Sequence, residues 1–597
     1  MSRFLPNLAR RRCEMASTII SMVAFQTVSN PKFLFRARLI SVMCVAAAFL
    51  LLAQLYSVQI VNGSEYSEKA ERQYSRPNQE LWSRGSIFFS TRSGELVSAA
   101  TLKTGFTLVI RQSEITDREA VWNALSRYVA LDKDDFLAKM SKRSHGGEER
   151  IARKLGTDVA PLIDKLGLKG VYLYKERWRF YPGGRLSANL LGFVGFDGDI
   201  LLGQYGLERY YNDTLSRDSG GLYKNFFAEI FSGVKKAVGP GRSEGDIVTS
   251  IEPSVESFLE NTLAELQETF TANRVGGIIM DPSTGRIYGM ALSPSFDPNS
   301  YGKETNPSIY SNSLVESVYE MGSIIKPITI AVGLDAKVIT ATSTYYDAGF
   351  LTLNNKTISN FDGKGRGRVS MQEVLNQSLN TGAVTVALKL GKDNFREYFK
   401  KFGLGEETGI DLPAEAAGLV RNLESGRDIE LATASYGQGI ALTPIQTVRA
   451  LSALGNGGYL VTPHIVTEIK YKTGVRRSVE SSDRKQILKP ETSTEISRML
   501  VEVVDTALLH GAYKMERHSI AAKTGTALIA NPDGGGYYED RFLHSFFGYF
   551  PAYNPSFIVF LYAVEPKGVE FASASLTAPF MNIAKFLINY YEIPPDR

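Results

Sequence analysis

Hydrophobic residues form one long uninterrupted run near the start of the chain. Residues 39–56 are almost wholly apolar, and no charged residue lies between Leu39 and Ser64. A helix of that length extends about 27 Å, enough to cross the hydrocarbon core of a bilayer. A buried core helix or the apolar part of a signal peptide is the alternative, but the run is long for a signal peptide and lacks an evident cleavage site. The pattern therefore predicts a single transmembrane helix at residues 39–60.

The charges before this helix predict its orientation. Residues 1–38 hold seven Arg or Lys side chains and one acid, Glu14. Because basic flanks stay on the cytoplasmic side of a membrane, we expect residues 1–38 to be a cytoplasmic tail and everything after the helix to be exported. Both cysteines, Cys13 and Cys44, precede the exported part, which agrees with an oxidising compartment.

Apolar spacing after the helix predicts a first exported module at residues 61–240. Residues 87–97 flank the Gly-containing turn Thr91–Gly94, which indicates a β-hairpin. Residues 114–165 carry apolar residues at three- and four-residue spacing, which favours helices. The module holds no recognisable catalytic constellation, so we expect a mixed α+β pedestal that acts as a spacer.

The remaining residues, 241–597, carry strand patterns at both ends and helical patterns between them. Residues 246–251 favour a strand, 253–270 an amphipathic helix and 275–291 a β-hairpin. Strand patterns near the end, before a closing helix from about Leu576, lie at residues 519–530, 544–549 and 557–563. Strands at both ends with helices between them predict an α+β fold, in which both ends of the module complete an antiparallel sheet.

Composition and charge exclude several classes of function. The 597 residues are 44 % hydrophobic and 22 % charged, as in ordinary folded proteins. A net charge of +4, from 67 basic and 63 acidic side chains, gives no reason to expect a nucleic-acid partner. Two cysteines, and five histidines without an HExxH pattern, predict no metal site, and no GxxxxGK[ST] loop is present. We therefore expect neither a metal nor another cofactor.

The first candidate catalytic motif is Ser323-Ile324-Ile325-Lys326. If Ser323 starts a helix, Lys326 lies one turn further on, with its amine within reach of the hydroxyl. Serine needs a neighbouring base to act as a nucleophile, and lysine is a base only when burial or a nearby cation keeps it neutral. The flanking isoleucines favour burial. A second SxxK, Ser482–Lys485, lies in a charged stretch and is interpreted as a solvated loop.

The second candidate is Ser378-Leu379-Asn380, at the end of a helical pattern over residues 371–379. A hydroxyl at this place is suited to shuttle a proton, and an amide to hold a substrate carbonyl. A helix C-terminus with polar caps is the alternative interpretation. The same spacing recurs at Ser187-Ala188-Asn189, in the first module.

The third candidate is Lys523-Thr524-Gly525-Thr526. A strand with Lys and Thr side chains, and a Gly that permits close backbone approach, can pair with a peptide and hold its carboxylate. KTG also occurs at residues 103–105 and 472–474, which we interpret as hairpin turns. Only the copy at Lys523 adds a second threonine, Thr526, and lies among small apolar residues.

The three motifs follow one another within one module, in the combination typical of serine acyl-enzymes. With these motifs the sequence resembles the class B high-molecular-weight penicillin-binding proteins, the transpeptidases that cross-link peptidoglycan. The resemblance covers essentially the whole chain after the predicted membrane helix. Further matching segments are Arg84–Ile87, Tyr181–Gly184, Gly206–Glu208, Asp281–Gly285, Phe296–Asn299, Thr408–Pro413 and Tyr436–Ile440.

The resemblance implies a catalytic role for five of the motif residues. Ser323 would be the acylated nucleophile and Lys326 its general base. Ser378 would relay a proton to the departing D-alanine. Asn380 would contact the donor stem peptide, and Lys523 would tune the site electrostatically.

The same resemblance implies how the substrate is held. Thr524, Gly525 and Thr526 would bind the substrate at its terminal carboxylate, and the backbone N–H groups of Ser323 and Thr526 would form an oxyanion hole. The chain departs from the family pattern at Met321, where a proline is frequent, and in the Leu of Ser-Leu-Asn, where division-type members usually have a second Ser. Neither departure removes a catalytic group.

The resemblance also implies a cellular role and partners. Elongation-type relatives commonly carry an aspartate at the place of Asn380, and residues 403–413 look more like the division and sporulation branch, so a septal role is favoured over elongation. The implied partners are peptidoglycan stem peptides, β-lactams, a membrane-embedded glycan polymerase, division proteins and the cytoplasmic membrane. The polymerase is implied because the chain shows no polymerising domain.

Two other classes of function remain as alternatives. A β-lactamase or carboxypeptidase would use the same three motifs, but we find no carboxylate convincingly placed to activate a deacylating water. A non-enzymatic scaffold could retain the fold. It would have no need to keep all six motif residues intact, namely Ser323, Lys326, Ser378, Asn380, Lys523 and Thr526.

Overall fold

The computed structural model describes residues 82–141, 147–198, 200–217, 244–479 and 484–597, together with the helical residues 42–43, 46–47 and 51. The described residues from 82 onwards belong to one compact unit, Leu81–Arg597. The predicted basic tail and most of the predicted membrane helix lie outside the described residues. Within the described part of the chain, none of the helices combines the length and the apolar character that a membrane crossing requires.

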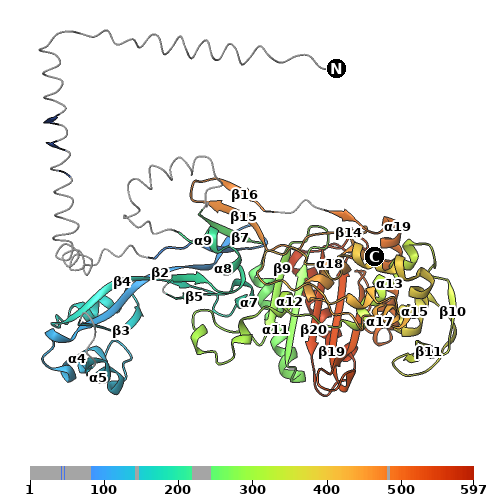
Figure 1. The fold of residues 1–597 in the computed structure, drawn as a ribbon, viewed down its shortest axis with the longest axis horizontal. Helices are drawn as coiled ribbons and strands as arrows, with labels where there is room; N and C mark the ends of the chain where they lie inside the picture. Colours follow the sequence, from blue (N-terminus) through green and yellow to red (C-terminus); the bar gives the residue numbers. More distant parts are fainter. Residues whose placement is uncertain are drawn as a thin grey trace, which may run out of the picture. The chain divides into compact units, whose positions relative to one another are not determined.

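A seven-stranded sheet forms the body of the first module (Figure 1). Its strands are β1 (Ile87–Ser90), β2 (Leu96–Arg111), β3 (Glu148–Leu155), β4 (Val171–Phe180), β7 (Gly245–Thr249), β15 (Val466–Tyr471) and β16 (Arg476–Ser478). The order is β16-β15-β7-β1-β2-β3, and β4 also pairs with β2. Because β7 pairs in parallel with β1 and β15 pairs with β7, segments from both sides of the predicted boundary at residue 240 share this sheet.

The hairpin predicted at residues 87–97 is confirmed by β1 and the start of β2. Two other expectations for this module are wrong. The stretch 114–165 is not all helical, because the strand β3 separates two helices from a third. The charged residues of β3 would suit a helix, but the pairing of β3 with β2 makes it a strand. The KTG at residues 103–105 lies inside β2 and is not a turn.

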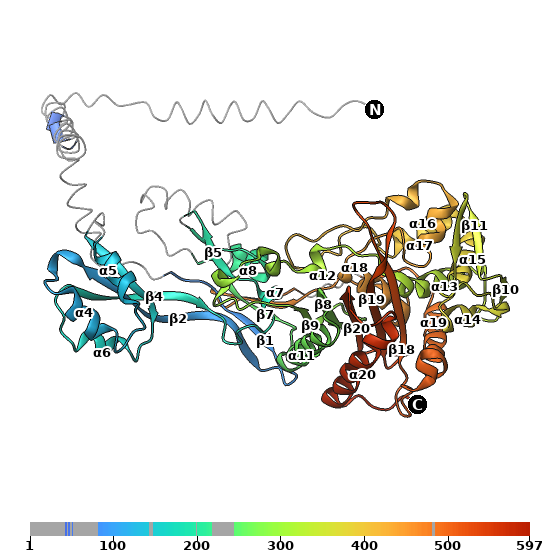
Figure 2. The same cartoon turned by 90° about the horizontal axis from the view of Figure 1, so that it is seen from below.

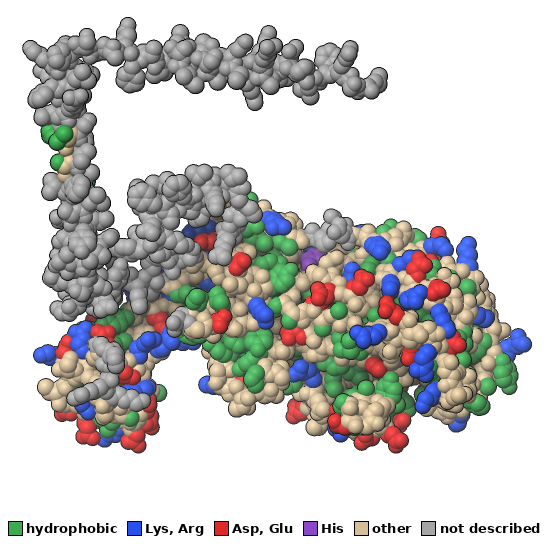
Figure 3. Space-filling view, in the orientation of Figure 1, with side chains coloured by type: hydrophobic (Ala, Val, Ile, Leu, Met, Phe, Trp, Pro, Cys, Tyr) green, Lys and Arg blue, Asp and Glu red, His purple; other side chains and the backbone are tan. Residues whose placement is uncertain are grey.

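Short helices complete the first module. They are α4 (Arg118–Leu125), α5 (Lys133–Ser141), α6 (Ala160–Asp164), α7 (Ala188–Leu191), α8 (Gly206–Tyr210) and α9 (Asn212–Leu215). A separate hairpin joins β5 (Val194–Asp197) to β6 (Ile200–Gly203). On the face drawn in Figure 3, acidic and basic side chains are interspersed, and acidic ones gather at the lower end of the lobe that holds α4 and α5.

A five-stranded antiparallel sheet forms the centre of the second module. Its strands, in spatial order, are β18 (Ala521–Ala530), β19 (Tyr537–Phe550), β20 (Phe557–Val564), β8 (Arg274–Met280) and β9 (Ile287–Ser293). β20, from the end of the chain, pairs with β8, from the start of the module. The predicted α+β fold, with a sheet completed from both ends, is therefore confirmed.

Helices cover both faces of this sheet (Figure 2). The long helices α11 (Pro253–Phe270) and α20 (Ala572–Tyr591) pack on one face, where Ile279 and Phe546 point. Ile278 and Phe547, their neighbours in sequence, belong to the core on the opposite face, together with α18 (Pro444–Gly455) and α19 (Pro490–Glu502). Alternate residues of these strands thus pack into the cores on opposite faces of the sheet, as expected for strands buried on both sides.

Further helices and strands complete the second module. The helices are α12 (Ser313–Glu316), the 3₁₀ helix η5 (Gly322–Ile325), α13 (Lys326–Asp335), α14 (Met371–Asn376), α15 (Asn380–Leu390), α16 (Lys392–Lys401) and α17 (Asp428–Ala434). Two short antiparallel pairs lie among them. They are β10 (Thr344–Asp347) with β13 (Gly367–Ser370), and β11 (Phe350–Leu353) with β12 (Lys356–Ser359).

Candidate active site

Ser323 and Lys326 lie where the 3₁₀ helix η5 passes into α13. Side chains three residues apart eclipse one another in a 3₁₀ turn, so this geometry places both on one side. Ser323 is half-buried and Lys326 is buried, with Ile324, Ile325 and Ile328 buried around them as expected. Among the residues that the structure describes, the Ser323 hydroxyl has no hydrogen-bond partner. It is therefore free to meet an electrophile.

Glycines allow the nucleophile's turn to lie directly against β18. Gly322 has a left-handed φ of 64°, and a Cβ there would come within 3.0 Å of the Thr526 carbonyl oxygen. A Cβ at Gly525 would lie 2.7 Å from the carbonyl oxygen of Met321, too close for any side chain. Ser545 on β19 donates to the same carbonyl at 2.8 Å. The glycine of the KTG motif is therefore required for contact between η5 and the sheet.

Ser378 lies between α14 and α15, in a left-handed conformation with φ of 54°. The helical pattern predicted to continue through residue 379 ends at Asn376 instead. Lys326 Nζ donates to Ser378 Oγ at 3.1 Å and also to the Ser378 carbonyl. Lys523 Nζ donates to Ser378 Oγ at 3.2 Å. A strained serine is thus held between the two lysines of the first and third motifs.

Burial changes the acidity of both lysines, and the charge of Lys523 adds to the effect on Lys326. Burial lowers the pKa of Lys326 well below its usual value, and the charge of Lys523 lowers it further. Burial also lowers the pKa of Lys523, to about 8. A neutral Lys326 amine can accept a proton, while Lys523 keeps much of its positive charge near neutral pH. The roles that the resemblance implies, base for Lys326 and electrostatic partner for Lys523, are compatible with these acidities and stay predictions.

Asn380 and the two threonines lie on α15 and β18. Asn380 is the first residue of α15, and its Nδ2 donates to the carbonyl of Ser359 at 2.8 Å. Thr524 and Thr526 are half-buried and share one face of β18, and Thr526 Oγ1 accepts a hydrogen bond from Ala572 N at 3.1 Å. β18 is the edge strand of its sheet, so its outer edge is available to an extended peptide.

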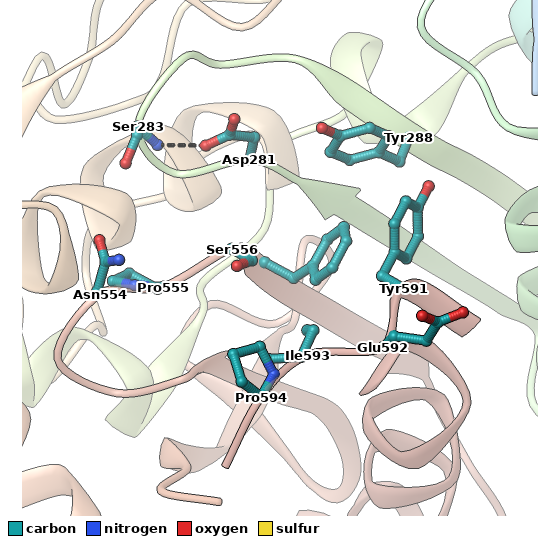
Figure 4. A pocket seen from close by; sticks show the side chains of 11 residues that line it. Asp281, Ser283, Tyr288, Asn554, Pro555, Ser556, Tyr591, Glu592, Ile593 and Pro594 are labelled. Atoms are coloured by element: carbon teal, nitrogen blue, oxygen red, sulfur yellow. Dashed lines mark hydrogen bonds between the residues drawn. The ribbon is translucent and has the colours of Figure 1, made fainter. Parts of the chain in front are cut away.

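A cavity of about 310 Å³ lies between the second and third motifs. Ser378, Lys523, Thr524, Ser573 and Phe361 are among the residues that line it. A larger hollow of about 460 Å³ lies at the end of α20, where Tyr288 and Tyr591 face turn residues (Figure 4). None of the three motifs contributes a residue to that second hollow.

The other copies of the motifs lie elsewhere. Ser187–Asn189 is buried at the start of α7, and Lys472–Gly474 forms the turn between β15 and β16, as predicted. Ser482 lies outside the described residues. No cluster of His, Cys, Asp and Glu in the described ranges has the form of a metal site.

Sequence reasoning missed three residues around the nucleophile. Ser545 contacts the Met321 carbonyl, and His544 lies opposite Thr526 on β19. Glu320 accepts hydrogen bonds from the Tyr537 hydroxyl at 3.0 and 3.2 Å, and burial raises the pKa of its carboxyl. A histidine within the mostly apolar residues 542–550 of β19 was the one available signal, and nothing in the sequence connected it to Thr526.

Together these features form a candidate active site at the edge of an antiparallel sheet, with the residue types of a serine acyl-transferase. Residues 275–585 match the model of the penicillin-binding protein transpeptidase domain, and residues 82–225 match that of the penicillin-binding protein dimerisation domain. The chain therefore belongs to the penicillin-binding protein transpeptidase family, and its two domains are those of a class B penicillin-binding protein.

Individual relatives agree with this assignment. Stage V sporulation protein D of Bacillus subtilis is 31 % identical over 92 % of this chain and 84 % of its own length. The peptidoglycan D,D-transpeptidase FtsI of Escherichia coli is 25 % identical over 92 % of this chain and 91 % of its own. The crystal structure of penicillin-binding protein 3 from Mycobacterium tuberculosis, complexed with aztreonam, covers 87 % of this chain and 98 % of its own, with a TM-score of 0.66 at 21 % identity.

Proposed function

We propose that this protein is a peptidoglycan D,D-transpeptidase, which joins stem peptides through a serine acyl-enzyme and releases D-alanine. The observation that carries the proposal is the position of Ser378 Oγ, 3.1 Å from Lys326 Nζ and 3.2 Å from Lys523 Nζ. Two buried lysines without an acidic partner destabilise a fold, because each charge loses its water. The same arrangement suits proton transfer, which needs a neutral amine beside a hydroxyl.

In the first half-reaction the substrate acylates Ser323. Lys326 takes the hydroxyl proton as Ser323 Oγ bonds to the carbonyl carbon of the penultimate D-alanine. The backbone N–H groups of Ser323 and Thr526 stabilise the oxyanion. Ser378 passes a proton to the departing amine, the C–N bond breaks, and D-alanine leaves.

The other motif residues hold the donor peptide. Asn380 contacts its stem, and Lys523 places positive charge near its terminal carboxylate. Thr524, Gly525 and Thr526 bind that carboxylate along the open edge of β18. This set of contacts selects a peptide that ends in a free carboxylate.

In the second half-reaction an amine of an acceptor stem peptide attacks the ester carbonyl. The new amide bond forms, the C–O bond to Ser323 breaks, and the proton lost by the amine returns to the serine oxygen through Lys326. Water in place of the amine would give the carboxypeptidase reaction. We favour transfer, because FtsI of Escherichia coli, the relative named above as a D,D-transpeptidase, matches the chain over 92 % of its length.

We also propose a septal role at the outer face of the cytoplasmic membrane, with residues 39–60 as the anchor and residues 1–38 in the cytoplasm. Residues 61–240 would be the pedestal and 241–597 the transpeptidase domain. Asn380 and the likeness to FtsI and a sporulation protein support septal action. A separate membrane-embedded glycan polymerase and division proteins would be its partners. Depletion in a rod-shaped host should give filaments without septa, whereas loss of rod shape with normal septa would favour elongation.

Covalent labelling tests the chemistry. A β-lactam carries a strained amide that should acylate the same hydroxyl as the substrate. The full-length protein in detergent, treated with a penicillin and digested, should show the adduct by mass spectrometry on the peptide that contains Ser323. Ser323→Ala should show none. An adduct on the peptide containing Ser482, or no adduct on the intact protein, would contradict the proposal.

A further inference from the structure

The hydroxyl of Thr526 is oriented by the start of a helix. Ala572 N–H, at the first residue of α20, donates to Thr526 Oγ1 at 3.1 Å. Because that hydrogen bond occupies a lone pair of the hydroxyl oxygen, the hydroxyl's own hydrogen is left to donate elsewhere. Ser573, the next residue of α20, lines the cavity that also contains Lys523 and Thr524. The Thr526 hydroxyl therefore keeps its hydrogen for a further partner.

His544 fixes this helix start against the sheet. It lies directly opposite Thr526 in the β18–β19 register and is fully buried. One ring nitrogen, Nε2, is 3.1 Å from the carbonyl oxygen of Glu570, and the other, Nδ1, is 2.8 Å from Ser575 Oγ. Glu570 and Ser575 bracket Ala572 in sequence. The imidazole therefore holds the chain on both sides of the N–H group that contacts Thr526.

The partners of the ring determine its tautomer. A carbonyl oxygen can only accept a hydrogen bond, so Nε2 carries a proton. Burial lowers the pKa of His544 to about 4, so the ring is neutral at physiological pH and Nδ1 is an acceptor. Ser575 must then donate to Nδ1. Both polar contacts of the ring are thereby satisfied, and neither involves the substrate.

We propose that His544 is a positioning residue for recognition of the substrate's terminal carboxylate. With Ser575 it holds the first turn of α20 so that Ala572 N–H orients Thr526 Oγ1, whose hydrogen donates to the carboxylate. The proposal rests on the function proposed above, in which Thr526 binds that carboxylate. It predicts a defect confined to ligands that carry the carboxylate, because acylation of Ser323 itself does not involve the ring.

The test compares two acylating agents on the full-length protein in detergent, benzylpenicillin and its methyl ester, in which the carboxylate is blocked. His544→Met fills the ring's space but makes neither hydrogen bond. It should lower the second-order acylation constant for benzylpenicillin about tenfold, the expected loss of one hydrogen bond to a charged group. The constant for the ester should stay within about twofold. His544→Gln, whose amide can still donate to the Glu570 carbonyl, should recover part of the loss.

A double-mutant cycle separates positioning from a general loss of structure. If His544 acts through Thr526, then Thr526→Ala alone should reproduce the selective loss, and His544→Met with Thr526→Ala should lose no more. His464→Met is the matched control, because His464 is also buried but contacts the Thr462 carbonyl and none of the motif residues. In His464→Met, the ratio of the acylation constants for benzylpenicillin and its methyl ester should equal that of the natural protein.

Three outcomes would overturn the proposal. They are an equal loss for benzylpenicillin and its ester, an additive loss in the double variant, and an unchanged constant for benzylpenicillin in His544→Met. Failure of the proposed function would look different, because the natural protein would then not be acylated at Ser323 by either agent.

Discussion

Two groups of buried charges in the same compact unit differ in one respect, the signs of their members. In the first module Glu208 lies between two arginines, 2.6 Å from Arg84 Nε and 2.5 Å from Arg179 Nε. In the cleft Lys326 and Lys523 converge on Ser378 Oγ, and within the described residues neither has a carboxylate partner. The charges around Glu208 are therefore compensated by charges of opposite sign, whereas the two lysines of the cleft are not.

The acidities follow this difference. Burial alone would raise the pKa of Glu208, but the two guanidinium groups outweigh it, and the pKa lies below its usual value. Glu208 is therefore permanently charged and can only hold its neighbours in place. The pKa of Lys326 lies far below its usual value because burial and Lys523 act in the same direction. Compensated charges thus serve structure, and uncompensated ones of like sign make a group reactive.

The largest expected effect comes from removing the uncompensated amine. Lys326→Met fills a similar volume but cannot accept a proton, so the second-order constant for acylation by a penicillin should fall by about 10⁴-fold or more. Stability should not fall, because a buried amine without an acidic partner is replaced by an apolar chain. Stopped-flow labelling and urea unfolding measure the two quantities. A variant that keeps acylation, or that unfolds much more easily, would break the comparison.

Removing the central charge of the compensated group should have the opposite profile. Glu208→Gln leaves two buried guanidinium groups without a carboxylate, and loss of one partner of such a group costs about 3–5 kcal/mol of unfolding free energy. The acylation constant per folded molecule should stay close to normal. Glu397→Gln is the control, because its ion pair with Lys401 lies on the exposed side of α16 and its loss should leave the urea midpoint unchanged.

The pH dependence of acylation sharpens the contrast within the cleft. The rate should rise with pH as Lys326 loses its proton and becomes a base. It should fall again near pH 8, where Lys523 loses the charge that attracts the substrate carboxylate. One unit above that pKa about a tenth of Lys523 remains charged, so the rate at pH 9 should be about tenfold below the maximum. A penicillin ester should show the rise without the fall. If the acylation rate fell above pH 8 with both agents, the fall would come from the titration of a group other than Lys523.

Local patterns predicted much of the fold. The helix over Pro253–Phe270, the β8–β9 hairpin and the sheet closed from both ends follow from apolar spacing and turn residues that lie close together in the chain. The pattern failed at residues 148–155, where strand pairing with distant residues overrode helix propensity. The pairing of a strand with a partner far away in the sequence leaves no pattern in the residues of that strand alone.

The candidate site was predictable as a set of residues but not as a geometry. The three motifs identified Ser323, Lys326, Ser378 and Lys523. Which of them touch was not evident, because Lys326 and Ser378 are 52 positions apart and their contact depends on the left-handed conformation of Ser378. The spacer expected at residues 61–240 also proves to share strands and buried charges with the rest of the unit, through partners that only the fold brings together.

A third group of buried charges tests whether like signs matter outside the cleft. On α11, Glu256 accepts from Ser187 Oγ at 2.9 Å and from Met290 N at 2.7 Å, while Glu260 accepts from Ser187 N at 2.7 Å. Burial raises the pKa of Glu256 to about 7, and burial together with Glu256 raises that of Glu260 to about 8. Like the lysines, these carboxyls share one sign. Unlike the lysines, the two carboxyls hold a contact between the two modules.

The smallest expected effect is the pH dependence that this carboxyl pair gives to stability. The folded protein holds protons on the pair up to about pH 7–8, whereas the unfolded chain releases them near its ordinary value of 4.5. Stability should therefore fall as pH rises between these limits, since the folded state binds more protons. Glu256→Gln removes one titrating group, so its unfolding free energy relative to the natural protein should rise steadily from pH 5 to pH 8. Urea unfolding at pH 5, 6, 7 and 8 measures this difference, and Glu265→Gln, on the exposed face of the same helix, should leave it constant. If the difference in unfolding free energy between Glu256→Gln and the natural protein did not change with pH, Glu256 and Glu260 would both be charged in the folded protein. Like charges would then be buried here without any change in their pKa values.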